Sequence, residues 1–225
     1  MTAVVALLSQ KGGVGKSTLA RTLAVVATEV GLDVAVADLD PQQRTLMRWV
    51  QARDEGGVVP AIHVKGYDTP KEALAASQDA DLLILDMPGR LSDAITGVSR
   101  HIHFILQPTS PSIDDLHPSI LVFQALQRVQ YPRERMAFAL CRALGDKEAE
   151  ATRDYLEAQG HAVLRGAILE RLAYRNALNL GRSLTETKQP PLNAAARVMM
   201  LDLLDRALTV ATASHEPEHA RRQRA

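Results

Sequence analysis

The chain is poor in cysteine, in aromatic residues and in net charge. Of its 225 residues only Cys141 is a cysteine, and 4% are aromatic, with a single tryptophan. One cysteine excludes an internal disulfide and a metal site made of cysteines alone, and we expect Cys141 to be a small buried residue. The 26 basic and 26 acidic side chains give zero net charge. This excludes a uniformly basic nucleic-acid-binding protein but leaves room for a local basic face.

Long apolar runs are also absent, since none approaches the roughly 18 residues that a membrane span requires. The sequence begins with a strand pattern rather than a signal peptide, so a reducing cytoplasm is the predicted location. The apolar content of 46% over this length is sufficient for one domain with a substantial core. We expect that domain to cover residues 1–213. The polar segment 214–225 lacks periodicity and is expected to be disordered.

A glycine-rich segment is the most informative feature that is present. Residues 9–18 read SQKGGVGKST and follow the apolar run 4–8. Glycines let the backbone amides wrap an anion closely, next to the N-terminus of the helix that follows. Lys16 would neutralise the β- and γ-phosphates, and the Ser17 hydroxyl suits Mg²⁺. The predicted nucleotide-binding residues are Lys11, Gly12, Gly13, Val14, Gly15, Lys16, Ser17 and Thr18.

Strand and helix patterns alternate along the chain, which predicts an α/β fold with a mostly parallel, twisted sheet covered by helices on both faces. Together with the glycine-rich segment, this is the P-loop NTPase class. The expected strands are 4–8, 34–37, 61–64, 82–85, 102–106, 136–140 and 162–164. The expected helices are 17–30, 44–54, 71–78, 114–130, 147–159, 171–179 and 193–212.

Carboxylates follow two of the predicted strands. Asp86 ends the apolar run 82–85, and Asp38 and Asp40 follow the run 34–37. Because ligands bind beyond the carboxyl ends of parallel strands, these groups should meet the phosphate loop there. Asp86 has the Walker B arrangement and is the expected Mg²⁺ carboxylate. The simpler alternative is that Asp38 and Asp40 only cap the next helix.

The segment KGGVGKS, with Lys11 as a second lysine, resembles the deviant Walker A motif of the ParA/MinD family of ATPases. The resemblance implies a homodimer that sandwiches ATP, in which Lys11 reaches the nucleotide of the partner subunit. Asp38-Leu39-Asp40-Pro41-Gln42 resembles the switch I segment of that family. There the resemblance implies that Asp40 positions the attacking water, that Asp38 lies near the metal, and that the activity is Mg²⁺-dependent ATP hydrolysis.

Residues 1–208 look most like the short ParF-like partition ATPases of this family. Trp49 after switch I, the segment 106–111 and the segment 168–184 carry this likeness, and the last resembles the part that lines adenine and the dimer edge. Residues 87–90 read Met-Pro-Gly-Arg, where many chromosomal relatives have Cys-Pro-Pro-Ser. The resemblance implies a cytoplasmic, nucleoid-associated protein that segregates a plasmid, a chromosome or another large cargo on non-specific DNA. A centromere-binding or adaptor protein would stimulate hydrolysis.

A local basic region is the expected DNA contact. Residues 165–206 contain seven basic and four acidic side chains. The favoured contacts are Arg171, Arg175, Arg182 and Arg197, with the tail 221–224 next in line. The alternative is a solvated helix face with ordinary ion pairs.

Two other functions stay open at this stage. A MinD-like membrane switch requires a bulky, amphipathic C-terminal helix, whereas the tail is polar and contains Pro217. A metabolic ATP-dependent enzyme could use the same loop. Metal ligation by His101 and His103 lacks a third nearby ligand and is not expected.

Overall fold

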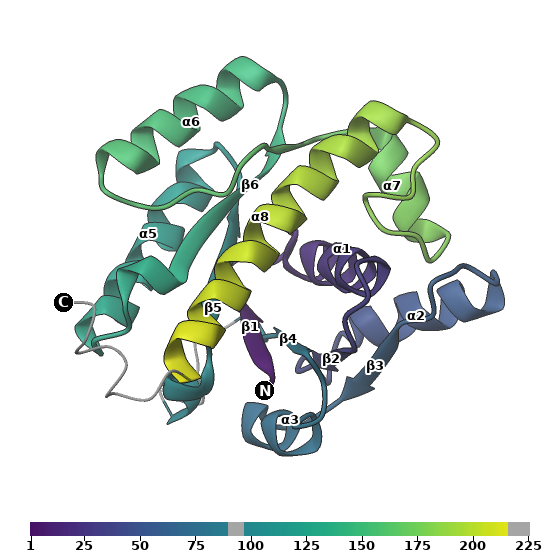
Figure 1. Cartoon of the computed structure of the whole chain (residues 1–225). Helices are drawn as coiled ribbons and strands as arrows, with labels where there is room; N and C mark the ends of the chain where they lie inside the picture. Colours follow the sequence, from purple (N-terminus) through teal and green to yellow (C-terminus); the bar gives the residue numbers. More distant parts are fainter. Residues whose placement is uncertain (90–96, 216–225) are drawn as a thin grey trace.

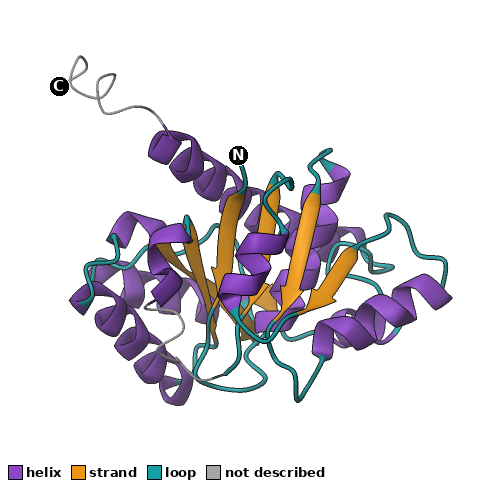
Figure 2. Ribbon diagram, turned by 90° about the horizontal axis from the view of Figure 1, so that it is seen from below, coloured by secondary structure: helices purple, strands orange, loops and turns teal. Residues whose placement is uncertain are grey.

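The computed structural model describes residues 1–89 and 97–215, and its centre is a parallel β-sheet. Seven strands lie in the order β3-β2-β4-β1-β5-β6-β7, and every pairing between neighbours is parallel (Figures 1 and 2). The strands are β1 Ala3–Leu7, β2 Val34–Asp38, β3 His63–Gly66, β4 Leu82–Asp86, β5 Phe104–Thr109, β6 Met136–Ala143 and β7 Ile168–Leu169. The predicted α/β architecture is confirmed.

Helices cover both faces of this sheet. The α-helices are α1 Lys16–Glu29, α2 Thr45–Glu55, α3 Pro70–Ala76, α5 Ile113–Arg128, α6 Asp146–Ala158, α7 Leu172–Asn179 and α8 Pro190–His215, with 3-10 turns at Ser99–His101 and Arg133–Arg135. Buried side chains of α1, α2, α7 and α8 share one core, and those of α3, α5 and α6 share the other. Figure 1 shows α8 crossing the sheet beside α1.

The two cores arise from the alternation of side chains along each strand. In β1, Val5 and Leu7 face the core that contains α1 and α8, whereas Val4 and Ala6 face the core that contains α5. Because both faces are covered, the central strands β1 and β4 read as continuous apolar runs without a polar alternation, whereas the edge strand β3 does not. Such runs made the strands visible in the sequence.

The strand order brings the predicted site residues to one edge. β4 and β2 lie on one side of β1, and β5 to β7 lie on the other, so the connections diverge at the carboxyl end of β1. Ligands bind at such a switch point in open α/β sheets. Leu7 pairs with Asp86 in register, and Asp86 pairs with Asp38.

Four strand predictions need correction, and one of them is β6, which covers 136–143 rather than 136–140. β3 begins at His63 rather than at 61, and β5 covers 104–109 rather than 102–106. The expected strand 162–164 is only an isolated bridge between Val163 and Phe138, while the pairing continues at Ile168–Leu169 as β7. A strand of two residues has no periodicity, so only its partner β6 reveals it.

The last helix is longer than expected. α8 ends at His215, two residues beyond the domain end predicted at 213, and the rest of the tail lies outside the described residues. Within residues 1–89 and 97–215, no helix is long and apolar enough to cross a membrane.

Candidate nucleotide-binding site

The glycine-rich segment forms the turn between β1 and α1. Gly13 and Gly15 have φ values of +79° and +111°, which L side chains rarely adopt. Gly15 is the N-cap of α1, and no side chain caps this helix end. The amides of the first turn are therefore available to an anion. Cys141 is 3% exposed, as predicted, and its Sγ would lie 3.5 Å from a Cβ at position 15.

Lys16 and Asp86 meet beneath this loop. Lys16 Nζ donates to Asp86 Oδ1 over 2.7 Å, and Asp86 is 1% exposed. Burial raises the pKa of Asp86, although the charge and hydrogen bond of Lys16 oppose that shift. Asp86 Oδ2 is buried and has no hydrogen-bond partner among the described residues. A free carboxylate oxygen in this position fits a magnesium ion, with the Ser17 hydroxyl as a further oxygen ligand.

A cavity of about 210 Å³ lies over the phosphate loop, and Asp40 lines it together with residues of the loop. Its lining includes Lys11, Lys16, Ser17 and Asp40. Asp40 is half-buried, and its Oδ1 accepts the amide of Gln43 over 3.0 Å. The cavity is completed by three residues that the sequence did not indicate, Gln43, Thr45 and Gly89. Gln43 and Thr45 follow the segment 38–42, where the chain passes from β2 into α2, and Gly89 belongs to the segment 87–90, so each is close to a motif but was not itself singled out.

Asp38 has a different setting from Asp40. It is 3% exposed, its Oδ2 accepts the amides of Leu46 and Met47, and its Oδ1 accepts the amide of Asp40. The N-cap residue of α2, Arg44, has φ of 45° and gives no side-chain cap. Asp38 therefore caps α2 from the end of β2. These contacts agree with the alternative from the sequence analysis, in which Asp38 caps the next helix. That Asp38 also lies near a metal ion stays a prediction.

The capping contacts make Asp38→Ala destabilising even without nucleotide or metal. Three amides lose their acceptor, one of them buried, so the free energy of unfolding should fall by about 1–3 kcal/mol. Asp38→Asn keeps one carbonyl oxygen and should lose less. Urea denaturation in the presence of a chelator measures both. Wild-type stability of Asp38→Ala under these conditions would contradict the capping role.

The side chain of Lys11, in the loop between β1 and α1, lies against the first turn of α5 of the same chain. Its Nζ is 2.5 Å from Asp115 Oδ1 and donates to the Asp114 carbonyl over 3.2 Å, while half of the side chain stays exposed. Its predicted reach to the nucleotide of a partner subunit stays a prediction.

A second cavity of about 270 Å³ adjoins the loop. It is lined by Gly13 and Thr18, and by Tyr174, Leu178 and Leu184 from the segment expected to line adenine. Its surface is largely apolar and would suit a flat base.

Arg142 also lines this cavity, and it was not predicted as a site residue from the sequence. It has φ of 61°, donates to Glu170 over 3.0 Å and reaches the Gly13 carbonyl over 3.3 Å. It lies near the carboxyl end of β6, and the rule for strand ends could have indicated it.

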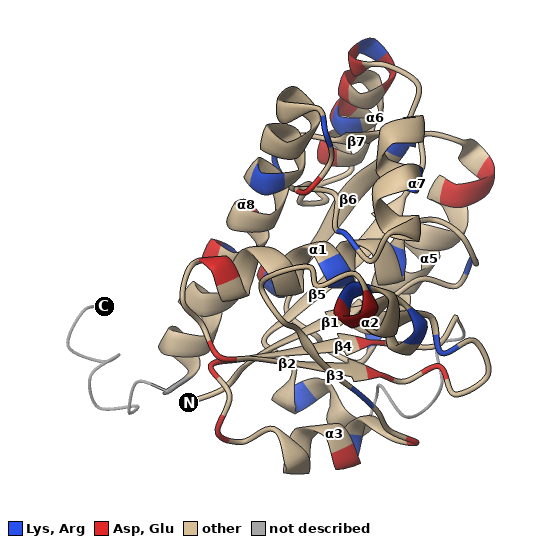
Figure 3. Cartoon of the chain, turned by 90° about the vertical axis from the view of Figure 1, so that its right-hand side faces the viewer, with Lys and Arg blue, Asp and Glu red and all other residues tan. Residues whose placement is uncertain are grey.

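The four predicted DNA arginines are not equally free. Arg175 pairs with Glu170 over 2.9 Å, Arg197 pairs with Glu29, and Arg171 donates to the carbonyls of Leu144 and Glu170. Glu29 is on α1, outside the segment counted in the sequence. Figure 3 shows both signs of charge along α6 and α8. Ordinary ion pairing thus describes part of this region, and the DNA contacts stay a prediction.

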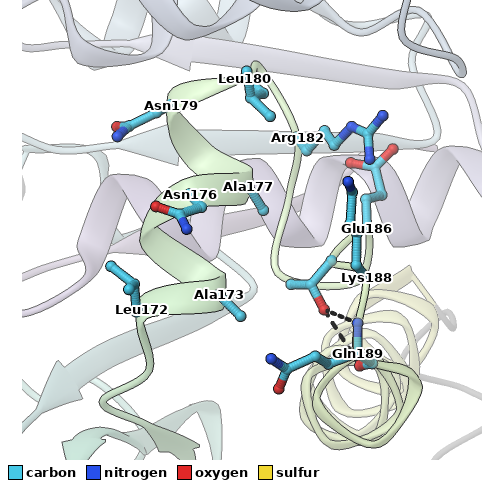
Figure 4. A pocket seen from close by; sticks show the side chains of 11 residues that line it. Leu172, Ala173, Asn176, Ala177, Asn179, Leu180, Arg182, Glu186, Lys188 and Gln189 are labelled. Atoms are coloured by element: carbon cyan, nitrogen blue, oxygen red, sulfur yellow. Dashed lines mark hydrogen bonds between the residues drawn. The ribbon is translucent and has the colours of Figure 1, made fainter.

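Arg182 lines a cavity of about 620 Å³ between α7 and the chain before α8 (Figure 4). Leu172, Ala173 and Ala177 form its α7 side, and Lys188 lies across from them. The Arg182 carbonyl accepts Trp49 Nε1 over 3.0 Å, which ties this segment to α2.

The remaining candidates lie away from the loop or outside the described residues. His103 Nδ1 accepts the amide of Val4 over 3.0 Å, just before β5 begins and thus at the opposite end of the strands. Arg90, the last residue of the segment 87–90, is not among the described residues.

A glycine loop between strand and helix, a loop lysine and a strand-end aspartate on a parallel sheet define a P-loop nucleotide-binding protein. Residues 5–189 match the family model described as the CobQ/CobB/MinD/ParA nucleotide-binding domain, and the chain belongs to this family.

Relatives of known name agree with that assignment. The chain is 26% identical over 205 residues to Protein ParA of Rhizobium radiobacter, covering 87% of this chain and 90% of that protein. Its fold resembles septum site-determining protein MinD of Pyrococcus horikoshii in complex with Mg-ADP, at TM-score 0.71 and 19% identity over 91% and 96% of the two chains. It also resembles a plasmid partition protein of Borrelia burgdorferi bound to AMPPNP, at TM-score 0.69 and 13% identity over 93% and 99%.

Proposed function

We propose that this protein is an ATPase of the ParA type, which dimerises with ATP and positions DNA or another large cargo on non-specific DNA. The observation that carries this proposal is the pair Lys11 and Lys16, which line one cavity together with Asp40. One lysine suffices for a phosphate loop, so the second cation points to a step beyond simple nucleotide binding.

Different residues of the site would bind the phosphates, hold Mg²⁺ and position the water. The amides at the start of α1 and Lys16 would bind the phosphates of ATP. Asp86, through its free Oδ2, and Ser17 would hold Mg²⁺, which neutralises phosphate charge when bound. Asp40 would orient the attacking water, since it lines the same cavity. Phosphoryl transfer requires little beyond such positioning and charge neutralisation.

The DNA matrix and the stimulating partner are the finer part of the proposal. The similarity to Protein ParA supports them. The similarity to MinD concerns the fold alone and does not decide the function. A membrane switch and a metabolic enzyme therefore remain the alternatives. The deciding experiment measures ATP turnover and ATP-dependent binding with random duplex DNA, and in parallel with anionic vesicles. ATP-dependent binding to vesicles alone, or to neither surface, would reject the DNA-matrix proposal.

If arginines contact DNA phosphates, their loss should flatten the salt dependence of binding. Each lost phosphate contact removes about 0.9 from the slope of log affinity against log salt concentration. We expect the Arg182→Ala, Arg197→Ala protein to show this reduction with random duplex DNA in the presence of ATP. Arg100→Ala, an exposed change at the other end of the strands, serves as the charge control. A slope equal to that of the wild type would move the DNA site elsewhere.

A further inference from the structure

Arg53 of α2 is an arginine whose side chain is completely buried. Its Nη1 and Nη2 donate to Glu186 Oε2 and Oε1, each over 2.9 Å. Nη1 also donates to the Gly181 carbonyl over 3.0 Å, and Nε donates to the Pro60 carbonyl over 2.9 Å. Burying a guanidinium is costly unless such bonds satisfy it. We call Arg53, Gly181 and Glu186 the arginine clamp.

Glu186 joins the clamp to the turn that precedes it in the chain. Its Oε2 also accepts the amide of Ser183 over 2.6 Å, so one carboxylate binds both Arg53 and the turn 183–186. Burial alone would raise the pKa of Glu186, but hydrogen bonds from Arg53 and from the Ser183 amide outweigh burial and hold that pKa below its ordinary value. The carboxylate therefore stays charged at neutral pH, and the ion pair persists.

Gly181 lets the clamped segment approach α2 closely. Its φ is +69°, and a Cβ at this position would collide with the backbone nitrogen of Arg53. Glycine alone lacks that atom. The next residue, Arg182, accepts Trp49 Nε1 at its carbonyl over 3.0 Å. The segment 181–186 is thus fixed to α2 by a backbone contact, by the indole of Trp49 and by the buried ion pair.

The clamped segment supplies one wall of the cavity beside the phosphate loop. Leu184 is 1% exposed and lines that cavity, as does Leu178 from the preceding helix. Among the described residues that line it, neither Arg53 nor Glu186 occurs. The clamp therefore lies behind the wall, where it can act on an occupant of the cavity only through the position of Leu184.

We infer that Arg53 and Glu186 are positioning residues for the base of the nucleotide, because they hold Leu184 in place as a wall of the second cavity. The inference rests on the proposed function, and it adds that the base of ATP occupies this cavity while the phosphates bind at the loop. The loop is the turn between β1 and α1, whereas the clamp joins α2 to the chain before α8. Phosphate binding should survive the loss of the clamp, and base binding should not.

The size of the effect depends on the fraction of molecules in which the wall is in place. If loss of the clamp lowers that fraction to between about a tenth and a hundredth, the dissociation constant for ATP rises about 10- to 100-fold. Tripolyphosphate has no base and binds both states equally, so its dissociation constant should stay within about twofold. The ratio of the two constants separates positioning of the base from a merely structural role, because a folding defect would weaken both ligands together.

Two variants break the clamp in different ways, and a third serves as the matched control. Arg53→Lys keeps the charge but cannot form two parallel bonds with the carboxylate. Glu186→Gln keeps the shape without the charge. Asp202 of α8 is 7% exposed, accepts the Arg165 amide over 2.9 Å and pairs with Arg206 over 3.2 Å. Asp202→Asn therefore removes a buried carboxylate of the same kind, from a residue that lines neither nucleotide cavity.

The first measurement is calorimetric titration of each full-length protein with ATP and Mg²⁺, and separately with tripolyphosphate and Mg²⁺. Arg53→Lys and Glu186→Gln should bind ATP about 10- to 100-fold more weakly and tripolyphosphate as the wild type does. Asp202→Asn should bind both ligands as the wild type does. The protein with both clamp changes should lose no more than the larger single loss, because the pair acts as a unit. Glu186→Gln, the milder change, decides the matter if Arg53→Lys does not fold.

Two results of this titration would overturn the inference. In one, neither ligand binds more weakly to the clamp variants. In the other, both ligands weaken by the same factor. A wild type that binds ATP no better than tripolyphosphate would also overturn it, because no base would then be recognised.

The second measurement reads the clamp without a ligand, by hydrogen exchange of the segment 181–186. The Ser183 amide bonds to Glu186, and the Leu184 amide bonds to Thr22 Oγ1 over 3.4 Å, so both should be protected while the segment is held. Glu186→Gln should exchange several-fold faster there, and Asp202→Asn should not. Unchanged exchange in Glu186→Gln would show that the ion pair does not hold the wall. If the wild type prefers ATP as expected but neither dimerises with it nor hydrolyses it, the proposed function fails while the role of the clamp stands.

Discussion

The Asp40→Ala protein should bind ATP and dimerise, but hydrolyse ATP about 100- to 10,000-fold more slowly than the wild type. Asp40 lines the cavity with Lys16 and Ser17, so its loss removes the group that we propose orients water, while the phosphate contacts remain. A single-cycle hydrolysis assay with equal loading of ATP measures this step, and dimerisation is recorded in the same samples.

Asp40→Asn separates this role from a local structural one. An asparagine oxygen can still accept the Gln43 amide that Asp40 Oδ1 accepts over 3.0 Å, but it carries no negative charge. Both variants should therefore be slow if Asp40 acts on water. If Asp40→Asn hydrolysed ATP as fast as the wild type, the only role left for Asp40 would be to accept the hydrogen bond from the Gln43 amide.

Lys11→Ala should bind ATP through Lys16 but lose the ATP-dependent dimer. Truncating one partner of a buried charge pair costs about 2–5 kcal/mol, and a symmetric dimer loses two such pairs. Half-dimerisation should therefore require at least about 1,000-fold more protein, since each step of about 1.4 kcal/mol is a factor of ten. Light scattering with ATP and Mg²⁺ measures it.

Lys71→Ala provides the comparison, because Lys71 is exposed on α3, away from the phosphate loop. It should dimerise like the wild type. A Lys11→Ala protein that forms the same ATP-dependent dimer at the same concentration would reject the sandwich. Nucleotide affinity should be recorded for both variants, so that a loss of ATP binding is not mistaken for a loss of dimerisation.

The sequence predicted those parts of the site that depend on local chain geometry. Gly13 and Gly15 adopt backbone angles that favour glycine, and Lys16 is one residue away, so the loop is encoded in a short segment. Asp86 ends a continuous apolar run, and Leu7 pairs with it in the sheet, as the strand-end rule required. The burial of Cys141 followed from an apolar run in the same way.

The tertiary structure decided which of several candidate partners each charged group has. Asp38 and Asp40 are two residues apart, and the residues alone allowed both to cap the next helix, yet Asp38 caps α2 in the interior and Asp40 lines the phosphate cavity. Arg197 looked free because its partner, Glu29, lies on another helix.

The sequence by itself determined the fold class, the phosphate loop and the strand-end carboxylates, because each is set by neighbours along the chain. Only the tertiary structure decided that Lys11 lies against Asp115, that Arg142 borders the second cavity, and that Gln43 and Gly89 complete the first. These contacts depend on which strands are adjacent in the sheet and in what register. Strand order is set by packing of the whole chain, and local patterns do not encode it.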